Sequence, residues 1–248
     1  IIRYNKIHNH GTYWTTGIRA GGGIKIGGAQ GGPTIENIYM YGNFIYNTWQ
    51  WGILAQADTS EYLYIWSNLV ASNGQSGICV SSTRGDPQNI WVYNNTVVKN
   101  GDREEADDSR GGIVIVGGDY YNIKNNILWN NRPSGAGGKY FQFYNSNTST
   151  ITSLDYNTVW HDTSQAALYD WLGTARDNSW MVANTAFCDN DNERDVDFTD
   201  PDGVDNIFGT VDDDYSLQAG SNEINDAADV SFSENIDLSN SDSWFETL

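Results

Sequence analysis

The chain has 248 residues, with 13 Lys and Arg against 32 Asp and Glu, and its formal charge is −19. This charge excludes nucleic acid as a partner, because a phosphate backbone is bound by basic surfaces. Aromatic residues make up 13% of the chain, which excludes a disordered protein. No stretch approaches the roughly 20 apolar residues of a membrane helix, so we expect no membrane span.

The acidic residues are concentrated at one end. From Phe187 to Leu248 the chain has eighteen acidic residues and one basic residue, Arg194. The preceding part is nearly neutral, so we expect a change of structural role near residue 187. The chain opens on Ile1 with neither an initiator Met nor a signal peptide, which predicts a processed or truncated N-terminus. A first coil without a cap favours either a fragment that lacks an N-terminal domain or an assembly of several chains.

A repeat runs through the first two thirds of the chain. Each copy has an Asn, an aliphatic residue two positions later and an apolar residue three positions earlier. The Asn residues are Asn5, Asn43, Asn68, Asn95, Asn126 and Asn157. Identical Asn side chains on successive coils can hydrogen-bond along a stack, so the pattern indicates a solenoid rather than isolated turns.

A second strand, mostly led by Gly, follows in each repeat. These segments are 23–26, 52–55, 77–80, 112–115 and, without the Gly, Tyr140–Phe143. Three short strands per repeat, with no helical period between them, describe one coil of a parallel β-helix. We predict an all-β, right-handed parallel β-helix over residues 1–162, a short helix and final coil elements over 163–186, and an irregular acidic segment over 187–248.

The repeats resemble a known family. Residues 37–47 and 89–97 are similar to the coils of right-handed parallel β-helix proteins of the pectate-lyase-like superfamily, and 198–203 with 214–221 resemble the closing segment of secreted bacterial members. The family's usual Ser-Pro pair is Ser221-Asn222 here. The resemblance implies an extracellular or cell-surface location and a polysaccharide or cell-surface glycan as partner. It does not select an activity, because the superfamily includes lyases, glycosidases, tailspikes and adhesins.

Six aromatic residues are predicted on the outside of the strand that precedes the Asn, because side chains alternate across a strand. They are Tyr39, Tyr41, Tyr64, Trp66, Trp91 and Tyr93. One interpretation is a platform on which the C–H faces of sugar rings stack. The other is a contact covered by a loop, a tail or another subunit.

The Gly-led strands carry the chemistry in catalytic members of the superfamily. Their predicted outward residues are Lys25, Leu54, Cys79, Val114 and Gln142, with no carboxylate, which argues against a glycosidase with two carboxyl groups. A polysaccharide lyase needs a cation and a base, and Lys25, Arg84, Arg103 and Arg110 are candidates. The same residues also fit surface ion pairs. We therefore assign no catalytic residue.

The end of the chain gives three further expectations. Residues 163–173 are predicted to form a short helix that begins at Thr163 or Ser164 and ends at Gly173. The acidic loops predict a structural Ca²⁺ site, with a solvated acidic surface as the alternative. A disulfide between Cys79 and Cys188 is a hypothesis. The Ca²⁺ ligands are predicted to be Asp200, Asp202, Asp205, Asp212, Asp213 and Asp214.

Two functional hypotheses follow. In the first, the protein binds or processes carbohydrate outside the cell, and a lyase is favoured over a glycosidase if it is an enzyme. In the second, it is a non-catalytic structural or adhesive surface protein that self-associates through its aromatic face and its first coil.

Overall fold

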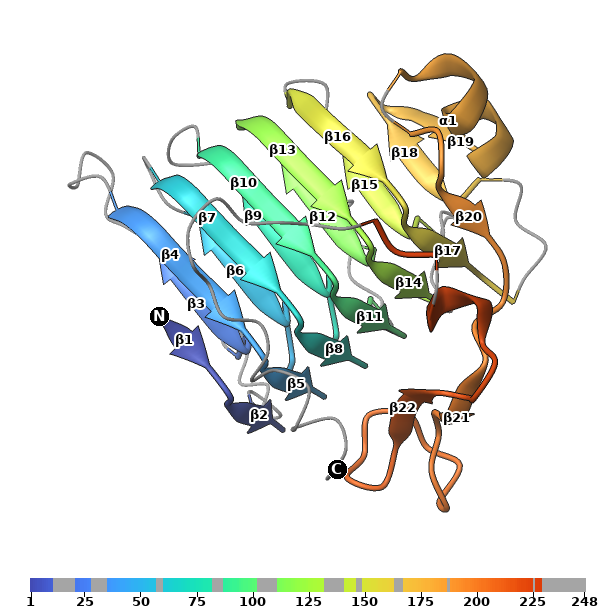
Figure 1. Ribbon diagram of the computed structural model, residues 1–248. Helices are drawn as coiled ribbons and strands as arrows, with labels where there is room; N and C mark the ends of the chain where they lie inside the picture. The colour runs from blue at the N-terminus through green and yellow to red at the C-terminus, as the bar shows by residue number, and fades with distance from the viewer. Residues whose placement is uncertain are drawn as a thin grey trace.

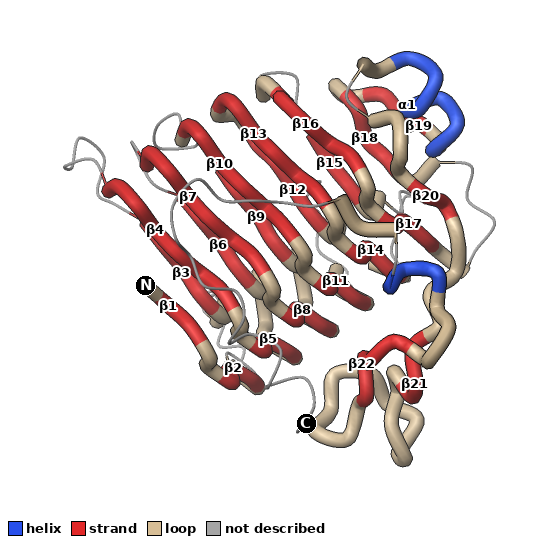
Figure 2. The backbone as a smooth tube through the Cα atoms, viewed as in Figure 1, coloured by secondary structure: helices blue, strands red, loops and turns tan. Residues whose placement is uncertain are grey.

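The computed structural model describes residues 1–10, 21–27, 35–56, 60–81, 87–101, 111–131, 141–145, 149–162, 167–186, 188–224 and 226–228. Its strands stack into three long parallel sheets that wind as a right-handed parallel β-helix (Figure 1), which confirms the predicted fold class. Strands dominate the chain, and the longest helix lies at the C-terminal end of the solenoid (Figure 2). In the described part of the chain, none of the helices is long and apolar enough to span a membrane.

Each coil contributes one strand to each of the three sheets, here called A, B and C. Sheet A contains β1 (Ile2–Arg3), β4 (Ile35–Tyr41), β7 (Ser60–Trp66), β10 (Gln88–Tyr93), β13 (Asp119–Lys124) and β16 (Ile151–Asp155). Sheet B contains β2 (Lys6–His8), β5 (Phe44–Tyr46), β8 (Leu69–Ala71), β11 (Thr96–Val98), β14 (Ile127–Trp129), β17 (Thr158–Trp160) and β20 (Asn192–Glu193). Sheet C contains β3 (Ile24–Gly27), β6 (Ile53–Gln56), β9 (Ile78–Ser81), β12 (Ile113–Val116), β15 (Phe143–Asn145), β18 (Tyr169–Trp171) and the antiparallel β19 (Thr174–Arg176).

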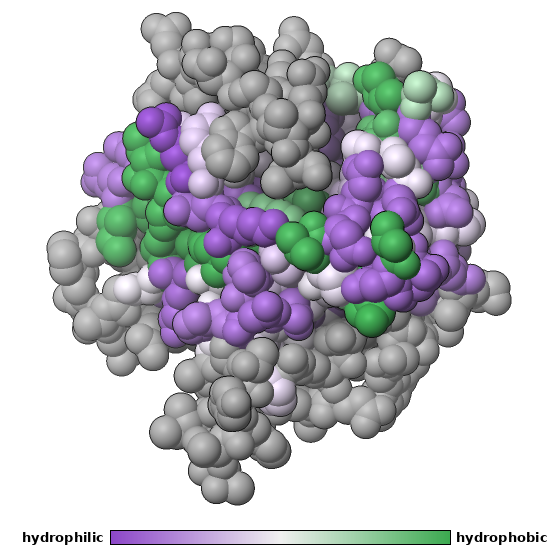
Figure 3. Space-filling model, turned by 90° about the horizontal axis from the view of Figure 1, so that it is seen from below, coloured by the Kyte–Doolittle hydropathy of each residue, from purple (hydrophilic) through white to green (hydrophobic). Residues whose placement is uncertain are grey.

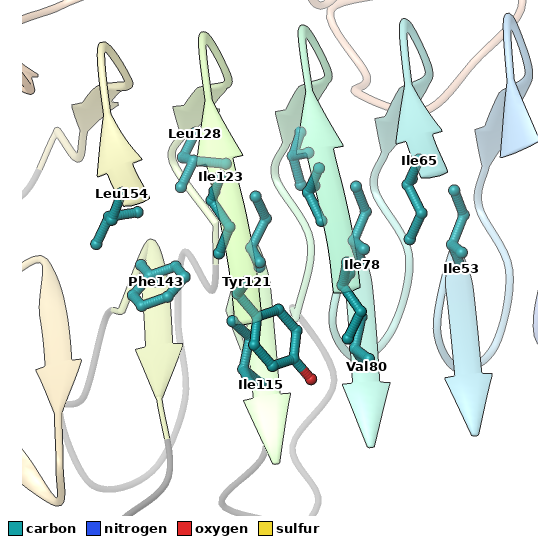
Figure 4. Close-up of a cluster of buried hydrophobic side chains, with 14 of the residues drawn as sticks. Ile53, Ile65, Ile78, Val80, Ile115, Tyr121, Ile123, Leu128, Phe143 and Leu154 are labelled. Carbon is teal, nitrogen blue, oxygen red and sulfur yellow. The ribbon is translucent and has the colours of Figure 1, made fainter. Parts of the chain in front are cut away.

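The core is a column of aliphatic side chains inside the coils (Figure 4). Ile53 pairs in register with Ile78, and Ile78 with Ile113, so each inward residue packs on its equivalent in the next coil. All three are fully buried. One coil cannot bury these residues alone, and stacking is therefore what makes the core.

Glycine precedes the strands of sheet C because the chain there passes close to sheet B. A Cβ on Gly77 would lie 2.3 Å from Cγ1 of Val97. The fifth coil differs from the prediction: β15 begins at Phe143, which pairs with Ile113, and Gln142 takes the place of the Gly. The predicted strand Tyr140–Phe143 is therefore wrong in register, and Tyr140 lies outside the described residues.

The predicted helix at 163–173 is also wrong. Residues 163–166 lie outside the described residues, and Tyr169–Trp171 form β18, because Tyr169 pairs with Phe143 and continues sheet C. The helix α1 (Asn178–Asn184) follows instead, capped by the Asp177 side chain, which accepts a hydrogen bond from the Trp180 N–H at 2.6 Å.

The acidic segment folds back along the outside of sheet B. It contains the antiparallel pair β21 (Phe198–Asp200) and β22 (Asp214–Leu217), followed by the turn η1 (Asn222–Ile224). We call residues 195–217 the strap. Its Val196, Phe198 and Tyr215 belong to one buried cluster with residues of sheet B, which are Tyr46, Leu69, Ala71, Val98 and Trp129. The strap therefore has its own apolar contact with the solenoid.

The two cysteines are buried and not bonded to each other, which contradicts the disulfide hypothesis. Cys79 faces outward from β9 and packs with Leu54 and Val114. Cys188 belongs to the solenoid core, where its Sγ lies 3.2 Å from Oδ2 of Asp191. One thiol therefore lies on the outer face of sheet C and the other lies inside the solenoid, in different hydrophobic clusters.

Candidate functional site

The six predicted aromatic residues form two columns on the outer face of sheet A. The register aligns Tyr39 with Tyr64 and Trp91, and it aligns Tyr41 with Trp66 and Tyr93. Ring centroids are 5.0 Å apart for Tyr39 and Tyr64, and 4.6 Å apart for Tyr64 and Trp91, with interplanar angles of 12° and 8°. The Tyr41 and Trp66 rings stack at 4.2 Å.

In these stacks the flat face of each ring packs against the flat face of its neighbour. Tyr64, Trp66 and Tyr93 are buried, and Tyr39, Tyr41 and Trp91 are half-buried. Burial raises the pKa of Tyr93 to about 12. Inside a column, the faces that a sugar ring needs are already covered by neighbouring rings. Ligand binding by these six residues therefore stays a prediction.

Two further tyrosines lie beside the columns and are more exposed. Tyr62 is 40% exposed and Tyr120 is 50% exposed. Both have φ of +62°, and both occupy the register position that Asn89 holds in the coil between them. The Tyr62 ring is parallel to that of Trp91, at 6.3 Å. We call Tyr62, Trp91 and Tyr120 the rim row.

Tyr62 and Tyr120 were not predicted, because strict alternation along the strand does not allow for a left-handed residue. The sequence does contain a signal. Asn37 and Asn89 stand at the same position as the two tyrosines and also have positive φ, a conformation that Asn adopts more readily than most residues. Asn and Tyr alternate at this position from coil to coil. The Asn residues therefore indicate a left-handed backbone at this position, also where a Tyr stands, and there the side chain points outward.

Basic residues stand at both ends of the second aromatic column. Arg3 pairs in register with Tyr41, and its Nη1 donates to the Tyr41 hydroxyl at 2.7 Å. That hydrogen bond raises the pKa of Arg3 further, and a guanidinium is already a permanent cation at its ordinary pKa. Lys124 pairs in register with Tyr93 at the other end. The outer face of sheet A is thus aromatic in the middle and basic at both ends of this column.

The outer face of sheet C does not form an active site of the usual plan. The true column is Lys25, Leu54, Cys79, Val114, Tyr144 and Asp170. Gln142 is not part of it, and the expectation of a column without a carboxylate is wrong, because Asp170 ends it with 4% of its surface exposed. One carboxylate still does not supply the pair that glycoside hydrolysis needs. Arg84, Arg103 and Arg110 lie outside the described residues.

The predicted Ca²⁺ ligands only partly gather. Asp205, Asp212 and Asp213 each place an oxygen within 3.4 Å of Oγ1 of Thr210, whose hydroxyl lowers the pKa of Asp212. Among the described residues, however, no three acidic, His or Cys side chains are placed to hold a metal ion. The Ca²⁺ site therefore stays a prediction, and these three aspartates are the predicted ligands that share Thr210 as a hydrogen-bond donor.

The other predicted ligands do not join that group. The Asp214 carboxylate accepts a hydrogen bond from the Ser216 N–H at 2.9 Å. Asp200 and Asp202 contribute no oxygen to the Thr210 group. Asp213 also accepts from the Gly209 N–H at 2.6 Å, which ties its carboxylate to the backbone of the strap.

The predicted Asn stack is present and fully connected. In each step the backbone N–H and the Nδ2 of one Asn donate to Oδ1 of the next, as from Asn95 to Asn126 at 3.0 Å for both bonds. The last acceptor is Asp191, which receives both bonds from Asn157. The second oxygen of Asp191 lies 3.0 Å from the Tyr169 hydroxyl.

A second polar stack was missed. It joins Thr48, Asn73, Asn100 and Asn131, each of which stands five positions after an Asn of the first stack, and it ends at Gln142. The spacing of Asn68 to Asn73 and of Asn95 to Asn100 is visible in the sequence and was the available signal.

Comparisons with known proteins add no family. No family model matches the chain, and no curated protein and no solved structure matches it.

Proposed function

We propose that this β-helix binds carbohydrate along the outer side of sheet A, and that it belongs to the pectate-lyase-like superfamily and acts outside the cell or at a cell surface. The observation that carries the binding proposal is the rim row. Tyr62 and Tyr120 expose aromatic surface on the same side of the solenoid, two coils apart, with the half-buried Trp91 on the coil between them.

The geometry of the rim row suits an extended ligand. Coils repeat at about 4.8 Å, so Tyr62 and Tyr120 are separated by about 9.6 Å along the axis. A chain of sugar rings that runs parallel to the axis would meet an aromatic ring at intervals of that length. Tyrosine provides an apolar surface and a hydroxyl together, which matches the mixed surface of a sugar.

The stacked columns support the rim row mechanically. The Tyr62 ring lies parallel to Trp91, which stacks in turn on Tyr64. Rings that are held in place before binding lose little conformational entropy when a ligand arrives. The columns therefore favour binding, and Trp91, which also belongs to the rim row, is the column residue that would contact the ligand.

If the protein is catalytic, the residues favour β-elimination over hydrolysis. The Lys25 side chain is on the outside of sheet C and makes no ion pair with the described part of the chain, so it can supply the cation that β-elimination needs. Among the described residues, Asp170 is the single carboxylate of that column, whereas hydrolysis requires two.

A second candidate function is structural or adhesive self-association. It is favoured by the first coil, where Ile1 is 79% exposed beside a groove of about 390 Å³. The groove is lined in part by Ile2, Ile26 and Ile35. Hydrophobic surface is visible at this end of the molecule, at the left of Figure 3. Exposed apolar surface of this kind is typical of contacts between proteins.

We also propose a structural Ca²⁺ ion in the strap. Three carboxylates meet at Thr210, whose hydroxyl has one proton to share among them. A hard divalent cation would compensate the remaining charge. Asp205, Asp212 and Asp213 do not form a metal-binding group as they lie, so to hold the ion their carboxylates would turn from Thr210 toward it.

The carbohydrate proposal is tested with a panel of neutral and uronic-acid polysaccharides. Retardation of the protein in gels that contain the polymer measures binding, and ultraviolet absorbance of unsaturated products measures elimination. Retardation by at least one polymer supports the proposal. A protein that no polymer retards, and that forms oligomers by light scattering, would instead support self-association.

A further inference from the structure

Acidic side chains stand directly beside the rim row. The register of sheet A aligns one residue from each of four coils, one position before the residue with positive φ, and these are Glu36, Glu61, Gln88 and Asp119. We call these four residues the acidic column, since three of them are Asp or Glu. Both exposed tyrosines of the rim row therefore follow a carboxylate in the chain: Glu61 precedes Tyr62, and Asp119 precedes Tyr120.

The acidic column lies on the outer side of the solenoid. Glu36 is exposed, and Glu61 and Asp119 are half-buried. Leu63 and Tyr121, two positions later on the same strands, are fully buried in the core. None of the three carboxylates forms an ion pair with the described part of the chain. Their charge is therefore available to a ligand.

The surroundings leave the charge beside the rim row negative. Glu36 and Glu61 are aligned on neighbouring strands at about 4.8 Å, where like charges destabilise a sheet. The basic residues at the ends of the second aromatic column lie four residues farther along the strands, or about 13 Å away. Lys25 lines a groove together with Glu36, so the negative charge is least compensated at Glu61 and Asp119.

An aromatic ring and a carboxylate at one place both favour a cation. The face of an aromatic ring attracts ammonium groups electrostatically. A carboxylate accepts hydrogen bonds from ammonium and hydroxyl groups, but it has no proton to donate to a second carboxylate and repels it. The same pair of features occurs at Tyr62 and again, two coils farther, at Tyr120. The rim row therefore favours positively charged sugars over uronates.

We propose that Glu61 and Asp119 set the charge specificity of the rim row, and that its ligand is a glycan with free amino groups. This inference rests on the proposed carbohydrate function and narrows its ligand. The two carboxylates would pair with ammonium groups of the glycan while Tyr62 and Tyr120 contact its sugar rings. A uronate substrate for β-elimination would then be held on sheet C near Lys25, and not at the rim row.

Three hexasaccharides that differ in charge test the inference. Isothermal titration calorimetry at about pH 6 and about 0.15 M salt compares the oligomers of glucosamine, N-acetylglucosamine and galacturonate, which are cationic, neutral and anionic. We expect the glucosamine oligomer to bind about tenfold more tightly than the neutral oligomer, because two ion pairs are added. The galacturonate oligomer should bind most weakly of the three.

A double variant assigns the preference to the two carboxylates. Glu61→Gln combined with Asp119→Asn keeps the size and the acceptors of the side chains and removes two charges. The affinity for the glucosamine oligomer should fall about tenfold, and that for the neutral oligomer should stay within about twofold. Asp189→Asn combined with Asp197→Asn removes the same net charge from exposed positions outside sheet A. This control should bind like the natural protein, and it is needed because a chain of charge −19 attracts any polycation.

The outcomes separate this inference from the carbohydrate function. Equal losses in the two double variants would overturn the inference, because net charge would then explain the preference. A neutral or anionic oligomer that binds as tightly as the glucosamine oligomer would also overturn it, and the carbohydrate function would stand. If none of the three oligomers binds, the inference fails, whereas the carbohydrate function fails only if no polymer of the polysaccharide panel retards the protein.

Discussion

Asp191 accepts the hydrogen bonds of Asn157, the last Asn of the stack. Its Oδ1 accepts from the Asn157 backbone N–H at 2.7 Å and from Asn157 Nδ2 at 3.1 Å. Every earlier position of the stack is Asn. A carboxylate suits the last position, because it accepts at both oxygens and needs no further acceptor for an amide group. The side chain is buried, however, and this makes the end of the stack sensitive to pH.

The pH dependence of stability follows from that burial. Burial raises the pKa of Asp191 from 3.8 to about 6, against hydrogen bonds that lower it. The native state binds this proton more tightly than the unfolded state, so the free energy of unfolding falls as the pH rises from about 4 to about 6 and stays lower above. Its neighbours Tyr169 and Cys188 have pKa values raised mainly by burial and stay protonated in this range.

Asp191→Asn isolates this contribution. The amide keeps the acceptor for Asn157 and removes the charge. In urea unfolding between pH 4 and pH 7, we expect the stability of the variant relative to the natural protein to increase by about 3 kcal/mol with rising pH. Parallel pH profiles for the two proteins would show that Asp191 does not titrate in this range.

The position of an Asn within the stack should decide how much the free energy of unfolding falls when that Asn is replaced by Ala. Asn95→Ala leaves the buried backbone N–H of Asn68 without its acceptor, while Nδ2 of Asn68 keeps the Met40 and Trp66 carbonyls. The variant also removes the amide that donates to the buried Ile65 carbonyl, and we expect a loss of about 3 kcal/mol. Asn5→Ala, at the exposed first position, leaves nothing buried without a partner and should cost less than about 1 kcal/mol. Equal losses in chemical unfolding would argue against a continuous stack.

Substitutions of two glycines in sheet C and beside it should also differ in how much they destabilise the fold. Gly77→Ala places a Cβ 2.3 Å from Val97 Cγ1, and we expect it to destabilise the fold by about 2 kcal/mol or more. Gly27→Ala meets nothing closer than 3.6 Å and serves as the control, with an expected change within about 0.5 kcal/mol. Thermal unfolding of both variants measures the difference, and similar melting temperatures would be inconsistent with the close packing at Gly77.

The Ca²⁺ proposal predicts a chelator-sensitive strap. Removal of Ca²⁺ should lower the melting temperature by about 5 °C or more, since the ion stabilises only the folded state. Asp212→Asn should lose most of this response, and Asp189→Asn, an exposed residue outside the Thr210 group, should keep it. A melting temperature that is the same with and without chelator would remove the support for Ca²⁺.

The coils were predictable because their signals are local and repeated. Asn43, Asn68 and Asn95 recur with aliphatic residues at fixed offsets, and one coil confirms the next. The register of β15 was not predictable, because Gln142 replaces a Gly and belongs to the second polar stack, which was not recognised. Residues 169–171 form a strand rather than a helix because Tyr169 pairs with Phe143, a contact that no local pattern contains.

The candidate site was predictable only in part. Alternation along the strand correctly placed Trp66 and its five companions on one face, but it did not indicate that their ring faces are used on one another. Tyr62 was missed because its left-handed backbone interrupts the alternation. The strap was not foreseen either, since Phe198 and Tyr215 contact sheet B across a large separation in sequence.

Carbohydrate binding at the rim row is the central claim, and affinity electrophoresis of Tyr62→Ala combined with Tyr120→Ala tests it most directly. A polysaccharide that retards the natural protein should bind the variant about tenfold or more weakly, because two exposed rings are lost. Val204→Ala, an exposed apolar residue on the strap, is the control and should bind normally. Equal retardation of all three proteins, or retardation of none, would contradict the claim.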